Sequence, residues 1–463
     1  MSQQSLAARD LDVLWHPCSQ MQDYHGFPPL SIVGAEGCYL DLADGRRVID
    51  GISSWWCAAL GHRHPHVTAA LASQMERFCH VIQANTTNEG VVRLCERLLA
   101  MANGASVAEW GPQAAPGRRP GHFGKVFLTD NGSNGVEIGL KMAIQAQMQN
   151  GRPQRTTLAA LRNGYHGETV ACLALGDCDL YKQHYAELMF PVTMLGPLPY
   201  RCGPEDPRWG DAGDAWPVIE AQLAPLADHL AAIVYEPILQ GAGGMLVYDP
   251  DLLRRLRAWA DAHEVYLVAD EIAAGMGRCG TMLASHLSGV LPDIAVVSKG
   301  LTAGTLPMAA VLVPDAIYDI FLADYHSHRA FMHSNTYTGN ALAVAVANAA
   351  LDVFAADQVL DNVADNGRYM RQALAAMAAR RPDLEGVRGI GMMAAVDLRA
   401  SDGSALDPLH RTGFQVYQRA VQHGALLRNL GDTMYLFPPL TAPRSVIDDL
   451  LTALERSLGA SQE

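Results

Sequence analysis

Lysine is scarce in this chain, whose 463 residues include only Lys125, Lys141, Lys182 and Lys299. Lys299 directly follows the apolar run IAVVS and precedes a turn rich in small residues. In an α/β sheet the carboxyl ends of the strands form the edge where ligands bind, so an amine there points into a site. Such an amine is a nucleophile for carbonyl groups. The alternative is an ordinary surface lysine that follows a strand.

The other three lysines lie in less suitable places. Lys141 stands one helical turn after Glu137, and this spacing predicts an ion pair on a helix surface. Lys125 stands at the start of a strand-like run, and Lys182 lies in the polar segment LYKQHY. Chemistry that requires a lysine amine therefore points to Lys299.

A second strand-like run, VYLVA, ends at Asp270-Glu271. A lysine and an acid in such positions resemble those of pyridoxal-phosphate enzymes, in which the lysine forms an imine with the cofactor aldehyde. The acid forms a salt bridge with the pyridinium nitrogen and keeps it protonated, so the ring accepts electrons from a substrate carbanion. A solvated turn or a metal ligand is the alternative for these two acids.

Two further strand ends carry residues suited to a phosphorylated ring. Residues 131–134 (NGSN) follow the run KVFLT and open a helical segment, where backbone N–H groups and the Ser133 hydroxyl suit a phosphate. A plain helix cap is the alternative. Tyr165 follows the run TLAALR, and its ring is placed to stack on a pyridine. A core tyrosine is the alternative there.

The elements that position these residues alternate β-rich runs with helical periodicity, which indicates an α/β fold. Several runs are almost entirely apolar, which favours burial on both faces and parallel pairing. We expect a large domain over 64–335 with a mostly parallel seven-stranded sheet. Its strands are predicted at 125–129, 157–162, 192–195, 231–235, 265–269, 294–298 and 308–313.

The two ends of the chain are expected to meet in a discontinuous small α+β domain, 1–63 and 336–463. Residues 37–51 have the pattern of a hairpin, 340–380 and 408–424 are helical, and 434–440 is strand-like. The Gly/Pro-rich stretches 103–122 and 196–217 are too long for ordinary connections. They are either mobile surface loops or walls of a site.

Composition excludes several other classes of protein. The net charge is −14, from 34 basic and 48 acidic residues, without a basic block, so nucleic acid and anionic membranes are poor partners. The start MSQQSLAARD lacks the apolar core of a signal peptide, and no run is apolar enough for a membrane span. Nine cysteines without a C-x-x-C pair fit reduced thiols, so we expect a cytoplasmic protein.

The run LVADEIAAGMGRCG…PDIAVVSKGLTAG (267–304) resembles the signature of class III pyridoxal-phosphate aminotransferases, which have the type I fold of this cofactor class. The resemblance covers nearly the whole chain. Further segments resemble the members that convert 8-amino-7-oxononanoate to 7,8-diaminononanoate in biotin biosynthesis. These segments are LWHP (14–17), GISSWWCAALGHRHP (51–65), NGSNGVEIGLKMA (131–143), YHGET (165–169), EPILQGAGGM (236–245), TYTGN (336–340) and LRNLGDTMYLFPPL (427–440).

The resemblance implies roles for the cofactor-binding residues. Lys299 is the Schiff-base residue, Asp270 pairs with the pyridinium, and the Tyr165 ring stacks on the cofactor, so these three are the catalytic candidates. Gly132 and Ser133 bind the phosphate. Thr336 contacts the phosphate of the neighbouring subunit, which implies a homodimer with shared sites.

The resemblance also implies a substrate channel. Trp55 and Trp56 wall it, Arg428 binds the substrate carboxylate, and Tyr435 and Arg278 line the same pocket. An oxononanoate has its reacting ketone and its carboxylate at opposite ends, so an apolar channel that ends in an arginine suits it. Core packing for the tryptophans and a surface position for Arg428 are the alternatives.

The implied reaction is a ping-pong transamination through pyridoxamine phosphate, with S-adenosylmethionine or lysine as the amino donor. The donor stays open because Cys18 replaces the tyrosine that usually follows Trp-His-Pro. Two further departures lie near the phosphate site, Asn134 in place of a small apolar residue and HSN (333–335) in place of a Gly-Pro before the threonine. Neither removes a backbone donor by substituting proline, so we expect phosphate binding to survive.

Two other functions remain as alternatives. Another class III enzyme, such as an ω-amino acid:pyruvate aminotransferase or an aminomutase, would share the cofactor residues. A non-catalytic pyridoxal-phosphate-binding protein would share the fold. His62, His64 and His66 alternate as zinc ligands can, but no cysteine or acid partners them at ligand spacing, so no metal is expected.

Overall fold

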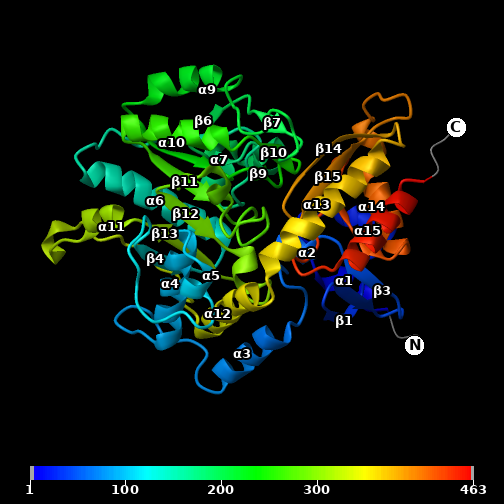
Figure 1. The fold of residues 1–463 in the computed structure, drawn as a ribbon, viewed down its shortest axis with the longest axis horizontal. Helices are drawn as coiled ribbons and strands as arrows, with labels where there is room; N and C mark the ends of the chain where they lie inside the picture. Colours follow the sequence, from blue (N-terminus) through cyan, green and yellow to red (C-terminus); the bar gives the residue numbers. More distant parts are fainter. Residues whose placement is uncertain (1–4, 460–463) are drawn as a thin grey trace.

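The computed structural model describes residues 5–459, which form a larger body and a smaller one (Figure 1). A seven-stranded sheet forms the centre of the larger body, and its strands are the seven that the sequence predicts. Their order across the sheet is β4 (Lys125–Thr129), β13 (Ala309–Val313), β12 (Ile294–Val297), β11 (Tyr266–Asp270), β8 (Leu230–Tyr235), β5 (Thr157–Leu161) and β6 (Val192–Leu195).

The sheet is mostly parallel, as predicted. The neighbours from β12 to β6 all run parallel, whereas β13 runs antiparallel to both β12 and β4. Every residue of β8, β12 and β13 is buried, which is why these runs are apolar at each position instead of alternating.

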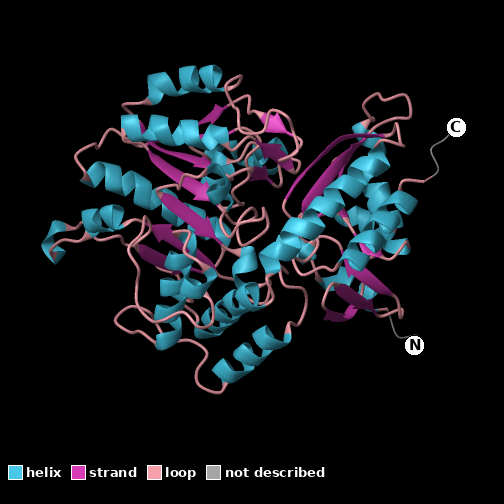
Figure 2. Cartoon of the chain, viewed as in Figure 1, coloured by secondary structure: helices cyan, strands magenta, loops and turns pink. Residues whose placement is uncertain are grey.

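Helices cover both faces of this sheet (Figure 2). On one face Val268, Val296 and Val311 share a core with α6 (Gly132–Gln149). Residues that alternate with these face the opposite side and pack with helices such as α4 and α10. The other helices of the larger body are α3 (Pro65–Met75), α4 (Glu89–Ala102), α5 (Val107–Trp110), α7 (Val170–Leu175), α8 (Asp179–Lys182), α9 (Trp216–Leu223), α10 (Asp251–His263), α11 (Asp315–Phe321) and α12 (Ala341–Ala356).

Both chain ends build the smaller body, where β3 pairs in parallel with β16 through Ile49 and Ala425. The predicted hairpin is confirmed as the antiparallel pair β2 and β3. The strands form two sheets, β1 (Ile32–Glu36), β2 (Tyr39–Leu42), β3 (Arg47–Asp50) and β16 (Ala425–Leu426), and then β14 (Leu384–Ile390), β15 (Met393–Leu398), β18 (Thr433–Leu436) and β17 (Arg428–Leu430). The helices are α1 (Leu6–Val13), α2 (Ser53–Trp56), α13 (Val359–Ala378), α14 (Thr412–Gln422) and α15 (Arg444–Ser457).

One helix of the predicted small-domain range lies elsewhere. Helix α12 packs against α3 and α4, beside the large sheet, and the chain enters the smaller body only with α13 (Figure 1). The predicted domain limits stay a prediction. The stretch 196–217 contains β7 (Tyr200–Arg201), which pairs with β10 (Leu246–Tyr248), and β10 pairs in turn with β9 (Leu239–Gln240).

Among residues 5–459 no single helix has both the length and the apolar character needed to cross a membrane. Helices α12 and α13 reach those limits only as a pair, bent by 67°.

Candidate active site

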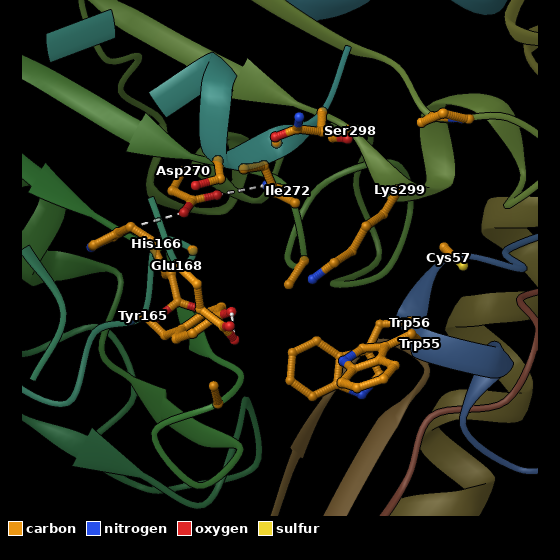
Figure 3. Close-up of a pocket in the computed structure, with 18 of the residues that line it drawn as sticks. Trp55, Trp56, Cys57, Tyr165, His166, Glu168, Asp270, Ile272, Ser298 and Lys299 are labelled. Atoms are coloured by element: carbon orange, nitrogen blue, oxygen red, sulfur yellow. Dashed lines mark hydrogen bonds and ion pairs between the residues drawn. The ribbon is translucent and has the colours of Figure 1, made fainter. Parts of the chain in front are cut away.

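A cavity of about 440 Å³ lies where the carboxyl ends of β4, β5, β8, β11 and β12 meet the smaller body (Figure 3). The larger body contributes residues that follow these strands, among them Gly132, Tyr165 and Lys299. The smaller body contributes Trp56 and Arg428 from opposite ends of the chain. The sheet edge and the joined chain ends therefore build one site together.

Lys299 begins a short 3₁₀ turn directly after β12, with φ +45°. Its Nζ lies 4.6 Å from the centroid of the Trp56 ring, inside the cavity. Burial lowers the pKa of Lys299, although the charges of Asp270 and Glu236 oppose that shift. A lysine amine of lowered pKa is more often neutral, and the neutral form is the nucleophile and base.

Asp270 ends β11 and is buried. Its Oδ2 accepts a hydrogen bond from His166 Nδ1 at 2.9 Å, and its Oδ1 accepts one from the Ile272 N–H at 3.1 Å. Burial by itself would lower the pKa of His166, but the bond to Asp270 and the negative charges of Asp270 and Glu236 raise it overall. The hydrogen bond from His166 fixes the orientation of the Asp270 carboxylate, which lines the cavity. The sequence contains the motif Tyr-His-Gly at 165–167, but the motif alone does not predict that His166 bonds to Asp270.

The start of α6 has the geometry of a phosphate cradle. Asn131 caps the helix by accepting from the Asn134 N–H at 3.0 Å. Gly132 leaves no room for a side chain, because a Cβ there would lie 2.7 Å from Ile272. The Ser133 hydroxyl lies 2.8 Å from the Thr169 hydroxyl, and the N–H groups of Gly132 and Ser133 at the start of the helix are suited to an anion.

Tyr165 and Glu168 lie on the opposite side of the cavity from the tryptophans (Figure 3), and Glu236 also lines the cavity. The Tyr165 hydroxyl donates to Glu168 Oε1 at 3.0 Å, and burial raises the pKa of Tyr165. Glu236 accepts from the N–H groups of Tyr165 and Gly241, both at 3.0 Å, and burial raises its pKa to about 7. Sequence reasoning missed both glutamates, since only the fold brings them to the cavity.

The predicted channel residues line the cavity at its mouth. Trp55 is 44% exposed, and the Arg428 guanidinium lies 4.3 Å from the centroid of its ring. The buried Trp56 donates from Nε1 to the Tyr435 hydroxyl at 3.2 Å. Cys18 also borders the mouth, where its Sγ lies 3.6 Å from Glu168 Oε1.

Two predicted site residues lie outside this cavity. Arg278 is buried in the smaller body, where its Nη1 donates to the carbonyls of Met392 at 2.7 Å and Pro438 at 2.8 Å. Burial lowers its pKa to about 9. The interpretation of Arg278 as a pocket-lining residue is therefore wrong in this structure, because its donors are used within the protein. Thr336 is exposed, with its carbonyl bonded to His80 Nε2 at 2.7 Å.

The predicted Glu137–Lys141 ion pair is absent from the described contacts. Glu137 instead accepts from the Ala171 N–H at 3.2 Å, and Lys141 Nζ lies 3.0 Å from His333 Nδ1. Ala171 and His333 are distant in the sequence and reach Glu137 and Lys141 only in the folded chain. The helical spacing alone therefore predicted the wrong partners.

The two sequence departures near the phosphate cradle meet in space. Asn134 donates to Asn335 Oδ1 at 2.6 Å, and Thr129 donates to the same oxygen at 2.9 Å. The substituted segment 333–335 is thereby bonded to the first turn of α6. These contacts use the side chains of Asn134 and Thr129, and the expectation that phosphate binding survives stays a prediction.

The three alternating histidines contact three different acids. His62 bonds to Asp50, His64 lies 3.4 Å from Asp357, and His66 lies 3.0 Å from Asp352. Within the part of the chain that the structure describes, no group of three or more His, Cys, Asp or Glu side chains could hold a metal ion.

The arrangement fits a phosphorylated pyridine aldehyde. The helix start would suit the phosphate, the Asp270 carboxylate a ring N–H, and the Lys299 amine a carbonyl. The close approach of Ile272 to Gly132 and the strained entry to Lys299 both shape this cavity. The residues present therefore form a site for pyridoxal phosphate and for amine chemistry.

Comparison with known proteins agrees with this geometry. The family model for class-III aminotransferases matches residues 20–458. The adenosylmethionine-8-amino-7-oxononanoate aminotransferase of Geobacter sulfurreducens is 35% identical, over 98% of this chain and 97% of its own. The enzyme of that name from Nitratidesulfovibrio vulgaris is 38% identical, over 98% of this chain and 82% of its own.

Solved structures have the same fold. The adenosylmethionine-8-amino-7-oxononanoate aminotransferase of Methanocaldococcus jannaschii superposes with a TM-score of 0.89 at 26% identity, covering 99% of each chain. A PLP-bound amine transaminase from an uncultivated Pseudomonas species gives 0.87 at 33% identity, over 97% of this chain and 99% of its own. The chain belongs to the class III aminotransferase family and is a pyridoxal-phosphate-dependent enzyme.

Proposed function

We propose that this aminotransferase transfers an amino group to the 7-keto group of 8-amino-7-oxononanoate, which yields 7,8-diaminononanoate in biotin biosynthesis. The observation that carries the proposal is the mouth of the cavity, where Arg428 stacks on Trp55 while Lys299 lies against Trp56. A substrate with a ketone at one end and a carboxylate at the other could place its ketone beside Lys299 and its carboxylate beside Arg428, with its methylenes along the two indole rings. The names of the relatives point to the same substrate.

Bound pyridoxal phosphate supplies an electron sink for the carbanion that forms when a substrate carbon loses its proton. Gly132 and Ser133 would hold the phosphate at the start of α6, and the Tyr165 ring would pack against the pyridine. Asp270, oriented by His166, would accept the proton of the ring nitrogen. Thr336 of the partner subunit completes the phosphate site.

Lys299 moves the proton. When free, its Nζ would move a proton from the amino-bearing carbon of the donor to the aldehyde-derived carbon of the cofactor, and in the second half-reaction from that cofactor carbon to the carbon that receives the amino group. Its lowered pKa favours the neutral amine that this transfer requires. The Trp56 ring beside Nζ keeps water from competing for that proton.

Arg428 binds the remote carboxylate through its planar fork of donors, and Tyr435 holds Trp56 in place. The acceptor is tested by giving the amino-loaded enzyme either 8-amino-7-oxononanoate or pyruvate and following product formation. We expect turnover with 8-amino-7-oxononanoate at least about tenfold more efficient in kcat/KM, since the long substrate alone uses the channel. Equal or better turnover with pyruvate would contradict the proposal.

The second candidate is an ω-aminotransferase that uses pyruvate or a related keto acid. The likeness to the amine transaminase structure, at 33% identity, favours it. Such an enzyme would accept pyruvate while leaving 8-amino-7-oxononanoate unchanged, so the same experiment separates the two candidates.

The donor is S-adenosylmethionine in our proposal, with lysine as the alternative. Cys18 leaves the mouth without the ring and hydroxyl of a tyrosine, and Glu168 faces that opening. Mixing the loaded enzyme with each donor separately and recording the visible absorbance of the bound cofactor decides between them. Bleaching by lysine alone would exclude S-adenosylmethionine.

We also propose a cytoplasmic homodimer. Four exposed apolar side chains lie near Thr336. Met332 and Tyr337 are close to it in the sequence, and Val81 and Ile82 follow His80, which bonds to the Thr336 carbonyl. A second copy of the chain would cover them and bring Thr336 to its partner's phosphate site. Light scattering on the purified enzyme should give twice the mass of one chain, and a monomer with full activity would contradict the proposal.

A further inference from the structure

The turn that carries both wall tryptophans is strained. Three of the four residues of α2, Ser53, Ser54 and Trp56, have positive φ values of +49°, +59° and +64°. Ser54 combines its φ with a ψ of −92°, a region that residues with side chains seldom adopt. Such backbone persists only where its surroundings hold it, and it gathers at functional sites.

Asp50, at the end of β3, accepts hydrogen bonds from this turn. Its Oδ1 accepts from the N–H of Ser54 at 2.8 Å and of Ile52 at 3.4 Å, and its Oδ2 accepts from the Ser54 hydroxyl at 3.0 Å. His62 Nε2 donates to Oδ2 at 2.8 Å. The carboxylate is fully buried, and a buried charge is tolerated only when it is bonded in this way.

Ser53 has a separate set of anchors. Its hydroxyl donates to the carbonyl of Phe437 at 2.7 Å, and Arg278 Nη2 donates to the Ser53 oxygen at 3.4 Å. Neither contact reaches Ser54, the residue with the most unusual backbone angles. The Asp50 carboxylate alone bonds both the N–H and the hydroxyl of that residue among the contacts of the described chain.

The position of the turn matters because Trp56 has little room to shift. A Cβ on Gly241 would lie 2.9 Å from the Trp56 ring, so the indole sits directly against the backbone of the larger body. Trp56 faces the Lys299 amine (Figure 3). The Arg428 guanidinium lies over the Trp55 ring. One turn therefore sets the channel wall at both the reacting end and the carboxylate end.

We propose that Asp50 is a positioning residue for substrate selection: its carboxylate holds the strained Ser53–Trp56 turn so that the two indoles form the wall for a long carboxylate substrate. This inference rests on the proposed function for the identity of that substrate. Asp50 lies outside the residues that line the cavity and acts only through the turn. Loosening the turn weakens the binding of long substrates while the cofactor residues keep their places.

The test uses the loaded, full-length enzyme with Asp50→Asn, which keeps one acceptor oxygen and loses the other. We expect KM for 8-amino-7-oxononanoate to rise about tenfold, as for one lost hydrogen bond to a charged group, while kcat changes less than about threefold. The visible absorbance of the bound cofactor should stay unchanged. Asp44→Asn, on an exposed residue of the same hairpin, is the matched control and should leave KM unchanged.

A second variant separates strain from general damage. Ser54→Gly in the Asp50→Asn background should recover part of the lost affinity, because glycine adopts this backbone region without steric cost. Ser54→Ala in the otherwise unchanged enzyme removes only the hydroxyl bond, so it should raise KM about two- to threefold and keeps the idea testable where Asp50→Asn does not fold.

Unchanged KM in folded Asp50→Asn and Ser54→Ala enzymes would overturn the inference, as would an equal loss of cofactor loading and of turnover with every substrate. Failure of the proposed function is recognised separately. Where the wild-type enzyme does not aminate 8-amino-7-oxononanoate, inhibition by nonanoate, a long carboxylate, reports the same wall. We expect Asp50→Asn to weaken that inhibition about tenfold, and equal inhibition of the two enzymes would overturn the inference.

Discussion

The deep end of the cavity and its mouth are built in different ways. At the deep end, Asp270 and Lys299 follow neighbouring parallel strands of one buried sheet, and Gly132 follows a third strand. At the mouth, Cys18, Trp55 and Arg428 come from segments far apart in the chain, and Trp55 is 44% exposed. The sheet positions the residues that react with the cofactor and substrate, whereas the joined chain ends position the residues that select the substrate.

This difference separates reaction from substrate choice. Changes at the mouth leave the buried strand ends in place, so such a fold accepts new substrates without losing its cofactor site. Mutations at the deep end should therefore lower kcat for every substrate, and mutations at the mouth should mainly raise KM for long ones.

The strongest test of the deep end is Lys299→Ala. Loss of the amine that forms the cofactor bond and moves the proton should lower turnover by about 10⁴-fold or more and abolish the visible absorbance of the bound cofactor. Lys125→Ala, on an exposed lysine at the start of β4, is the matched control and should retain both. Persisting activity in Lys299→Ala would remove that residue from the mechanism.

The adjacent acids Asp270 and Glu271 should differ sharply. Asp270→Asn takes the negative charge from the ring nitrogen and should lower kcat by about 10³-fold for all substrates. Glu271→Gln should leave kcat within a few-fold, since within residues 5–459 the Glu271 carboxylate accepts its hydrogen bonds from Ala284 and Ser285. Steady-state kinetics on the two variants decide, and similar losses in both would refute separate roles.

Arg428 tests the mouth. Arg428→Ala should raise KM for 8-amino-7-oxononanoate by about 10- to 100-fold with little change in kcat, because a bidentate carboxylate contact is lost. Arg428→Lys keeps the charge without the fork and should fall between. A drop in kcat without a change in KM would place Arg428 at the reacting end instead.

Glu271 also predicts a pH effect on stability. Burial raises its folded pKa to about 7 from an ordinary value of 4.5. Between these two values the folded protein binds the proton more tightly than the unfolded chain does, so its contribution to stability falls as pH rises from about 4.5 through 7. Denaturant unfolding of Glu271→Gln should show a flatter pH dependence across this window than the wild type, and identical slopes would contradict the assignment.

The smallest effect is expected from Cys18→Tyr. The substitution places a ring and a hydroxyl opposite Glu168 at the mouth. It should change KM for the amino donor by a few-fold, on the scale of one hydrogen bond, and leave KM for the acceptor unchanged. Kinetics with the donor varied at saturating acceptor measure this change in KM, and an equal effect on KM for both substrates would contradict a role of position 18 in binding the donor alone.

The same contrast explains what the sequence could reveal. The large sheet was predictable chiefly because inner strands such as β8, β12 and β13 are buried on both faces and therefore apolar at each position, and strand ends located Asp270 and Lys299. Arg278 was misplaced because its partners, Met392 and Pro438, are distant in the chain. His166 contacts Asp270, and Glu236 contacts the Tyr165 N–H, only after folding brings distant segments together. Their spacing in the sequence therefore does not predict these contacts.

The parallel pairing of Ile49 with Ala425 has a consequence for synthesis on the ribosome. The carbonyl of Gly51 accepts from the Phe437 N–H at 2.8 Å, so the base of the tryptophan turn is also bonded to residues made late. All seven strands of the large sheet emerge before either partner exists. The strands that carry the cofactor-binding residues are therefore synthesised first. The substrate-selecting mouth can form only after the C-terminal segment has been translated.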